Sequence, residues 1–159
     1  MKKLLTALMI LAAAATLKAG TDGYVMLSVF SPGQIPIAAT SLDGVRLNLL
    51  YGECQNLNGL DVGAVGRVRE NVNGLQVGAV NAVGADVAGV QLGLVNLVEA
   101  DFAGFQCALW NEVGAAATGF QLGLVNRATA LEGLQVGLVN FIGEPQTTCG
   151  CLPIVNFGW

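Results

Sequence analysis

Acidic side chains are the residues of this chain whose spacing comes closest to a catalytic or metal site. Asp86 and Asp101 stand fifteen residues apart, and Glu99 lies close to the second of them. Carboxylates that meet in space can transfer protons in acid–base catalysis or bind a calcium ion through their oxygens. The pattern ends at Ala116, where the next carboxylate would stand. We therefore interpret these side chains as solvated acids, and predict no enzyme activity, cofactor or metal.

Other groups that catalyse reactions are scarce in this chain. It has no histidine, and its only lysines are at positions 2, 3 and 18. The commonest general base is therefore absent, and the usual amine nucleophile is confined to the first residues.

The four cysteines do not form a disulfide framework. Cys107 stands where other repeats have valine or leucine, which predicts a buried apolar thiol. Cys149 and Cys151 are too close in an extended strand to bridge, because alternate side chains lie about 7 Å apart. Cys54 could pair with either of them, and the sequence leaves this pairing open.

The chain is organised around an eight-residue motif that recurs with a period of fifteen. Its copies read GLQVGAVN, GVQLGLVN, GFQCALWN, GFQLGLVN and GLQVGLVN, and they begin at Gly74, Gly89, Gly104, Gly119 and Gly133. Eroded copies begin at Gly59 and Gly44, and a last copy, CGCLPIVN, spans residues 149–156. Each unit is too small to fold alone, so it must bury itself against its neighbours.

Each unit alternates in a way that indicates β-structure. In the unit from Gly89 to Ala103, Val90, Leu92 and Leu94 point one way and the residues between them point the other. The alternation resumes after Asn96, so each unit holds two short strands. Glycine and asparagine tolerate positive φ, and we expect the corners at these residues.

Two all-β architectures can use such a unit. The first is a single-domain β-solenoid of about seven 15-residue coils stacked in parallel. The alternative is a small eight-stranded outer-membrane β-barrel with one antiparallel strand per unit. We favour the solenoid, because a meander repeats as a hairpin and because a barrel would turn a mid-strand asparagine toward lipid in every unit.

Stacking predicts ladders of equivalent residues. We expect inner ladders that start at Leu60, Val62 and Ala64 and repeat to Leu134, Val136 and Leu138. Glutamines should form an outer interaction face with Trp110, namely Gln76, Gln91, Gln106, Gln121 and Gln135. Asparagines should form a corner ladder, namely Asn81, Asn96, Asn111, Asn126 and Asn140. Stacked amides can hydrogen-bond to each other along the stack. Stacking also places Glu112 beside the oppositely charged Arg127 of the next coil.

The N-terminal residues indicate export. Residues 1–19 have two lysines, an apolar run and small residues before Gly20, which is typical of a secretory signal peptide. Residues 20–43 read as an N-terminal strand (Tyr24–Phe30) and cap, 44–156 as the repeat domain, and 157–159 as the C-terminal end. We expect the protein at the cell surface or in the outer membrane or periplasm.

The composition of residues 20–159 excludes nucleic acid as a partner. Four arginines face eleven carboxylates, so the formal net charge is −7. Nucleic-acid binding would require clustered Lys and Arg. The same balance disfavours tight docking on anionic lipid, although membrane association stays open.

The repeats resemble a known family. The motif G-[LVF]-Q-x-G-L-V-N, the lead-in LSVFSP, the segment GVRLNLLYGECQNLNGLDVGAV and the ending LPIVNFGW are similar to the bacterial surface repeat-containing proteins. The resemblance covers nearly all of residues 20–159 and implies an exported protein of unassigned activity. The expected function is a structural or interaction protein that self-associates or binds another cell-envelope component.

Overall fold

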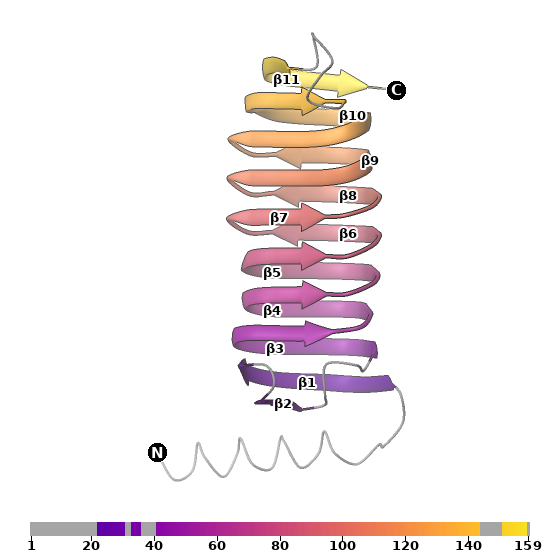
Figure 1. Cartoon of the computed structure of the whole chain (residues 1–159), viewed down its shortest axis with the longest axis vertical. Coiled ribbons are helices and arrows are strands. Elements are labelled where there is room, and N and C mark those ends of the chain that lie inside the picture. Colours follow the sequence, from indigo (N-terminus) through magenta and orange to yellow (C-terminus); the bar gives the residue numbers. More distant parts are fainter. Residues whose placement is uncertain (1–21, 31–32, 36–40, 144–150, 159) are drawn as a thin grey trace.

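A computed structural model describes residues 22–30, 33–35, 41–143 and 151–158. These residues form one tall stack of coils, with β1 and β2 at one end and β11 at the other (Figure 1). The predicted signal peptide, residues 1–19, lies outside the described residues. In the part of the chain that the structure describes, no helix has the length and apolarity of a membrane span.

All the regular elements in the described ranges are strands. They are β1 (Asp22–Phe30), β2 (Gly33–Ile35), β3 (Ser41–Cys54), β4 (Leu57–Val68), β5 (Val72–Val83), β6 (Val87–Leu92), β7 (Val95–Val98), β8 (Phe102–Cys107), β9 (Trp110–Leu122), β10 (Val125–Ile142) and β11 (Cys151–Gly158). Some span a whole coil, as β5 does, and others form half of one, as β6 and β7 do.

Successive coils pair in parallel and in register at the sequence period. Gly59 pairs with Gly74, Gly74 with Gly89, and so on to Gly133. The predicted β-solenoid is therefore confirmed, and the eight-stranded barrel is wrong, because a barrel of successive strands would pair them antiparallel. The predicted neighbours Glu112 and Arg127 lie opposite each other and form an ion pair of 3.1 Å.

The corners are not where the sequence predicted them. In the coil built from β6 and β7 the chain turns at Gly93–Leu94, and it turns again at Glu99–Asp101 before β8. Gly89 lies within β6 at φ 146°, and a Cβ there would sit 1.9 Å from the carbonyl oxygen of Gly74. The glycine recurs in every unit because the backbones of neighbouring coils approach closely there, and not because the chain turns.

The interior of the coil is the reverse of the one predicted. The glutamines and asparagines of the motif are 0–1% exposed, whereas Leu94, Leu109, Leu124 and Leu138 are 48–66% exposed. The three ladders predicted to lie inside, which start at Leu60, Val62 and Ala64, face outward. The apolar core comes from residues between the motifs, in two columns that run from Leu42 to Leu131 and from Cys54 to Ala128.

The last unit is a cap and not another parallel coil. We predicted that CGCLPIVN would continue the repeat, but β11 pairs antiparallel with β10. This reversal places Asn156 opposite Gln135 instead of Asn140. The one-residue deletion in the preceding unit falls at a register shift between Ala128 and Ala130, away from the motif.

Candidate functional site

The buried glutamines form a continuous hydrogen-bonded ladder through the stack. Each Nε2 donates to Oε1 of the glutamine in the coil before it, at 2.7 Å, from Gln135 down to Gln76. Gln76 Nε2 then donates to Oδ2 of Asp61 at 3.2 Å. At the other end, Asn156 Nδ2 donates to Gln135 Oε1 at 3.5 Å. The amides therefore satisfy each other inside the coil, which removes the penalty for burying them.

Asp61 ends this ladder as part of a buried ion pair. Arg46 is 0% exposed; its Nε donates to Asp61 Oδ1 at 2.8 Å, and its guanidinium also contacts Oδ2. Arg46 Nη1 donates to the carbonyl oxygen of Arg67 at 2.9 Å. Burial lowers the pKa of Arg46, but the hydrogen bond and charge of Asp61 outweigh it, so the pKa is raised. This cluster replaces the amide pattern in the first coils.

Gly66 departs from the asparagine of the later units for a steric reason. A Cβ at Gly66 would lie 2.4 Å from Asp61 Oδ2 and 3.1 Å from Arg46 Nη2. Asn48 lies against Gly52 and Gly63, and its Nδ2 donates to Asp61 Oδ1 at 2.8 Å. Its Oδ1 is the one buried side-chain oxygen or nitrogen among the described residues without a hydrogen-bond partner.

The asparagines form a second ladder that runs in the opposite direction. From Asn81 to Asn140, each Nδ2 donates to Oδ1 of the following coil at 2.7–2.9 Å. Several of these Nδ2 atoms also donate to backbone carbonyls, such as that of Leu122 at 2.9 Å. Because a carbonyl can only accept, it fixes the direction of the ladder. The predicted asparagine stacking is confirmed, but the side chains point inward from a strand and do not form a corner.

The predicted interaction face of glutamines is wrong, because all five are buried in the ladder. Trp110, which we assigned to the same face, is 40% exposed and lies on the outside of β9. Its Nε1 donates to Oε2 of Glu112 at 3.1 Å. Trp110 therefore lies on the outer surface, whereas the glutamines lie inside the coil.

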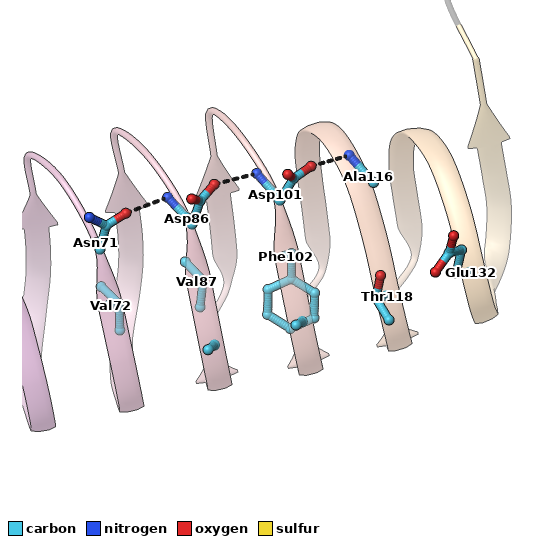
Figure 2. A pocket seen from close by; sticks show the side chains of 11 residues that line it. Asn71, Val72, Asp86, Val87, Asp101, Phe102, Ala116, Thr118 and Glu132 are labelled. Carbon is cyan, nitrogen blue, oxygen red and sulfur yellow. Dashed lines mark hydrogen bonds between the residues drawn. The ribbon is translucent and has the colours of Figure 1, made fainter.

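The acidic residues lie at the corner that follows the second strand of each coil. Asn71 Oδ1 accepts from the backbone nitrogen of Asp86 at 3.2 Å, and Asp86 Oδ1 accepts from that of Asp101 at 3.1 Å. Asp101 Oδ1 accepts from the nitrogen of Ala116 at 2.9 Å (Figure 2). The predicted adjacency of Asp86 and Asp101 is thus confirmed, and each carboxylate holds the backbone of the next coil.

We call this region the charged corner; it comprises residues 69–71, 84–86 and 99–101 with their neighbours. It borders a shallow pocket of about 590 Å³. Asp86, Asp101, Thr118 and Glu132 line it, and Glu99 does not. Within the described residues, no three His, Cys, Asp or Glu side chains gather closely enough to hold a metal. Hydrogen bonds from Gln55 and Asn56 hold the pKa of Glu70 below its usual range. The carboxylates of this corner therefore accept hydrogen bonds from the backbone and face solvent.

The cysteines are separate in the structure. Cys54 is a buried free thiol that accepts from Arg46 Nη1 at 3.1 Å, and burial raises its pKa to about 11. Cys151 is an exposed free thiol, and Cys149 lies outside the described residues. Cys107 is half-buried on the outer surface, so the prediction that it lies inside is wrong.

The opposite edge of the stack is apolar and solvent-facing. Four outward columns form this surface, which we call the apolar edge. They run from Leu60 to Leu134, Val62 to Val136, Ala64 to Leu138 and Val65 to Val139. None of the residues in these columns is charged. Phe105 and Phe120 stack on this surface with ring centroids 5.4 Å apart. The columns run along the stack on both sides of the corner at Gly78 and its equivalents, so the apolar surface continues around this corner.

A groove of about 530 Å³ lies in the apolar edge over the early coils. The small residues Gly63, Ala64, Gly78 and Ala79 line it, together with the larger Leu49 and Leu94 of the coils on either side. The alternation of the sequence did not reveal this surface, because it predicts that the leucines lie inside. The absence of charge from four positions in every unit was the signal that could have revealed it.

Comparison with family models, curated proteins and solved structures finds no match to this chain.

Proposed function

We propose that this chain is an exported, non-catalytic structural protein of the cell envelope that binds a protein surface through its apolar edge. The observation that carries the proposal is the uncharged edge itself, in which Leu94, Leu109 and Leu138 are more than half exposed. Proteins rarely expose contiguous apolar patches larger than a few hundred Å² unless the patch binds something. The proposal also assigns the chain to the surface repeat-containing family that its motifs resemble.

The extent of the edge supports a macromolecular partner. At about 4.8 Å per coil, six coils give a strip roughly 29 Å long. Four columns make it wide enough to present several hundred Å² of accessible surface, on the scale of the ~800 Å² that one partner buries in a standard interface. A small ligand would leave most of this surface in water.

The chemistry of the charged corner supports a structural role. Asp86 and Asp101 each accept a backbone hydrogen bond from the following coil. A carboxylate used in this way stabilises the stack at a corner where backbone groups would otherwise lack partners. Combined with the absence of histidine, this arrangement favours a scaffold over an enzyme.

The test combines processing with retention in the envelope. Expression of the full chain in a bacterial host should yield a protein that begins at Gly20 by mass spectrometry and remains in the envelope fraction after a salt wash. The double variant Leu109→Lys/Leu124→Lys should be released by the same wash. The matched control Ala103→Lys/Thr118→Lys adds the same charge to exposed positions at the opposite side of the same coils and should stay bound.

Each part of the proposal can fail separately. An unprocessed chain in the cytoplasm would contradict export. Equal retention of the two double variants would show that the apolar edge does not hold the protein in the envelope. Loss of retention after extraction of lipids alone would point to a membrane surface instead of a protein.

A further inference from the structure

The corner column of the apolar edge changes in bulk along the stack. Its residues are Ala64 and Ala79 in the early coils and Leu94, Leu109, Leu124 and Leu138 in the later ones. The groove lies where the column is small, next to Ala64 and Ala79. The leucines stand out where it is large, since Leu138 is 66% and Leu124 48% exposed. The two alanine coils therefore form a hollow between Leu49 and Leu94, and the four leucine coils form a raised strip beyond it.

We infer that the apolar edge pairs with the apolar edge of a second copy of this chain in antiparallel orientation, an inference that rests on the proposed function and names its partner. A twofold axis between the coils of Leu94 and Leu109 makes the two edges self-complementary. It places Ala64 opposite the partner's Leu138 and Ala79 opposite the partner's Leu124. Leu124 and Leu138 of each copy then lie over the groove of the other, and Leu94 packs against the partner's Leu109.

A parallel pair lacks this complementarity. Equivalent residues would meet, so Leu138 would face the partner's Leu138 while Ala64 faced the partner's Ala64. The leucines would hold the early coils apart and leave the groove empty, and an empty apolar space loses the contacts that would fill it. The difference in bulk between the alanine coils and the leucine coils thus selects the antiparallel orientation.

Charge also favours a second copy over a lipid surface. The acids Glu70, Asp86 and Asp101 lie at the charged corner, on the far side of the coil from the apolar edge. Two copies that meet at their apolar edges keep these acids apart and in water. A bilayer with anionic headgroups would instead attract basic residues and repel a chain of net negative charge.

The area is adequate for a dimer. A strip of six coils is roughly 29 Å long at the spacing of parallel strands. Its neighbours continue the apolar surface, because Leu47 is 43% exposed at one end and Phe157 is 62% exposed at the other. The contact thus approaches the ~800 Å² per partner of a standard interface.

The first experiment measures mass in solution. The chain from Gly20 onward should sediment as a dimer at micromolar concentration, and Leu109→Lys/Leu124→Lys should sediment as a monomer. The control Ala103→Lys/Thr118→Lys should remain a dimer. A monomeric wild-type chain overturns the pairing; if that chain still resists the salt wash of the envelope, the proposed function stands and only the partner is wrong.

The second experiment tests orientation by disulfide trapping. The background carries Cys107→Val, Cys149→Ser and Cys151→Ser, and it receives either Ala64→Cys or Leu138→Cys. Mixing the two under reducing conditions and then oxidising should cross-link them as a one-to-one pair, while each alone should stay uncross-linked. The positions in one copy are about 24 Å apart at the spacing of parallel strands, beyond the reach of a disulfide.

Self-cross-linking of Leu138→Cys alone would indicate parallel pairing and overturn the orientation. A dimer in which neither mixture cross-links would overturn the interface itself. The pair Ala79→Cys and Leu124→Cys repeats the test one coil inward, and it replaces the outer pair if either outer variant loses the far-UV circular dichroism of the background.

Discussion

Gln76 donates its side-chain amide to the carboxylate of Asp61, so an acid and not another glutamine ends the ladder. Every glutamine beyond it donates in the same direction, from the late coils toward the early ones. An ionised carboxylate can only accept, which makes it a fitting terminus for a chain of donors. The asparagine ladder runs the other way, so the dipoles of the two rows of amides oppose each other within one narrow interior.

Removing the charge of Asp61 should destabilise the early coils. Asp61→Asn leaves the guanidinium of Arg46 buried without a counter-ion, and breaking a buried pair in this way costs about 3–5 kcal/mol. Urea unfolding followed by circular dichroism would measure the loss. The double variant Arg46→Gln/Asp61→Gln continues the glutamine ladder into these coils and should lose less than Asp61→Asn. An Asp61→Asn variant as stable as the wild type would contradict this account.

Interrupting the glutamine ladder should be costly even with an apolar residue of similar size. Gln106→Leu leaves Gln91 Oε1 and Gln121 Nε2 without their partners. Each buried unsatisfied group costs about 1–3 kcal/mol. The control Cys107→Leu alters the adjacent outward residue to the type found at Leu92 and Leu122, and it should change the unfolding free energy little. A neutral effect of Gln106→Leu would mean that the amides contribute nothing to stability.

A side chain at the glycine within the strand should disrupt stacking. Gly104 has φ 136°, and a Cβ there would sit 1.9 Å from the carbonyl oxygen of Gly89. Gly104→Ala should therefore lower the unfolding free energy by more than the ~1–3 kcal/mol of backbone strain alone. Ala103→Ser, at the exposed residue next to it, should stay within about 0.5 kcal/mol of the wild type. A thermal shift no larger than that of Ala103→Ser would contradict the close approach of the coils.

Alkaline pH should destabilise the fold through Cys54. Burial raises the pKa of this thiol from 9.0 to about 11, so the folded state holds the proton more tightly than the unfolded state. The free energy of unfolding is unaffected below pH 9 and falls as the pH rises from about 9 to 11, by about 2–3 kcal/mol for a shift of this size. Cys54→Val, which matches Val68 and Val83 in its column, should remove this part of the pH dependence. Identical slopes for the two proteins would contradict the assignment.

The sequence by itself determined the fold class, the parallel stacking and the register. A motif repeated every fifteen residues pairs with its own copy in the next coil, so the repeat alone matches Glu112 to Arg127 and Asp86 to Asp101. It could not determine the direction of β11. The reversal depends on the hydrogen bonds that close the end of the stack, such as that from Asn156 to Gln135, and these do not follow the repeat.

Only the tertiary structure decided which side of the strand is inside. Alternation separates Leu75 and Val77 from Gln76, but it assigns neither group to the core. Hydrophobicity alone places the leucines inside, as we first expected. The structure reverses this because each glutamine finds its partner in the next coil, fifteen residues away, and because residues between the motifs, such as Val72 and Val83, supply the apolar core. Burial of the amides is favourable only once the stack exists, and the apolar edge is its consequence.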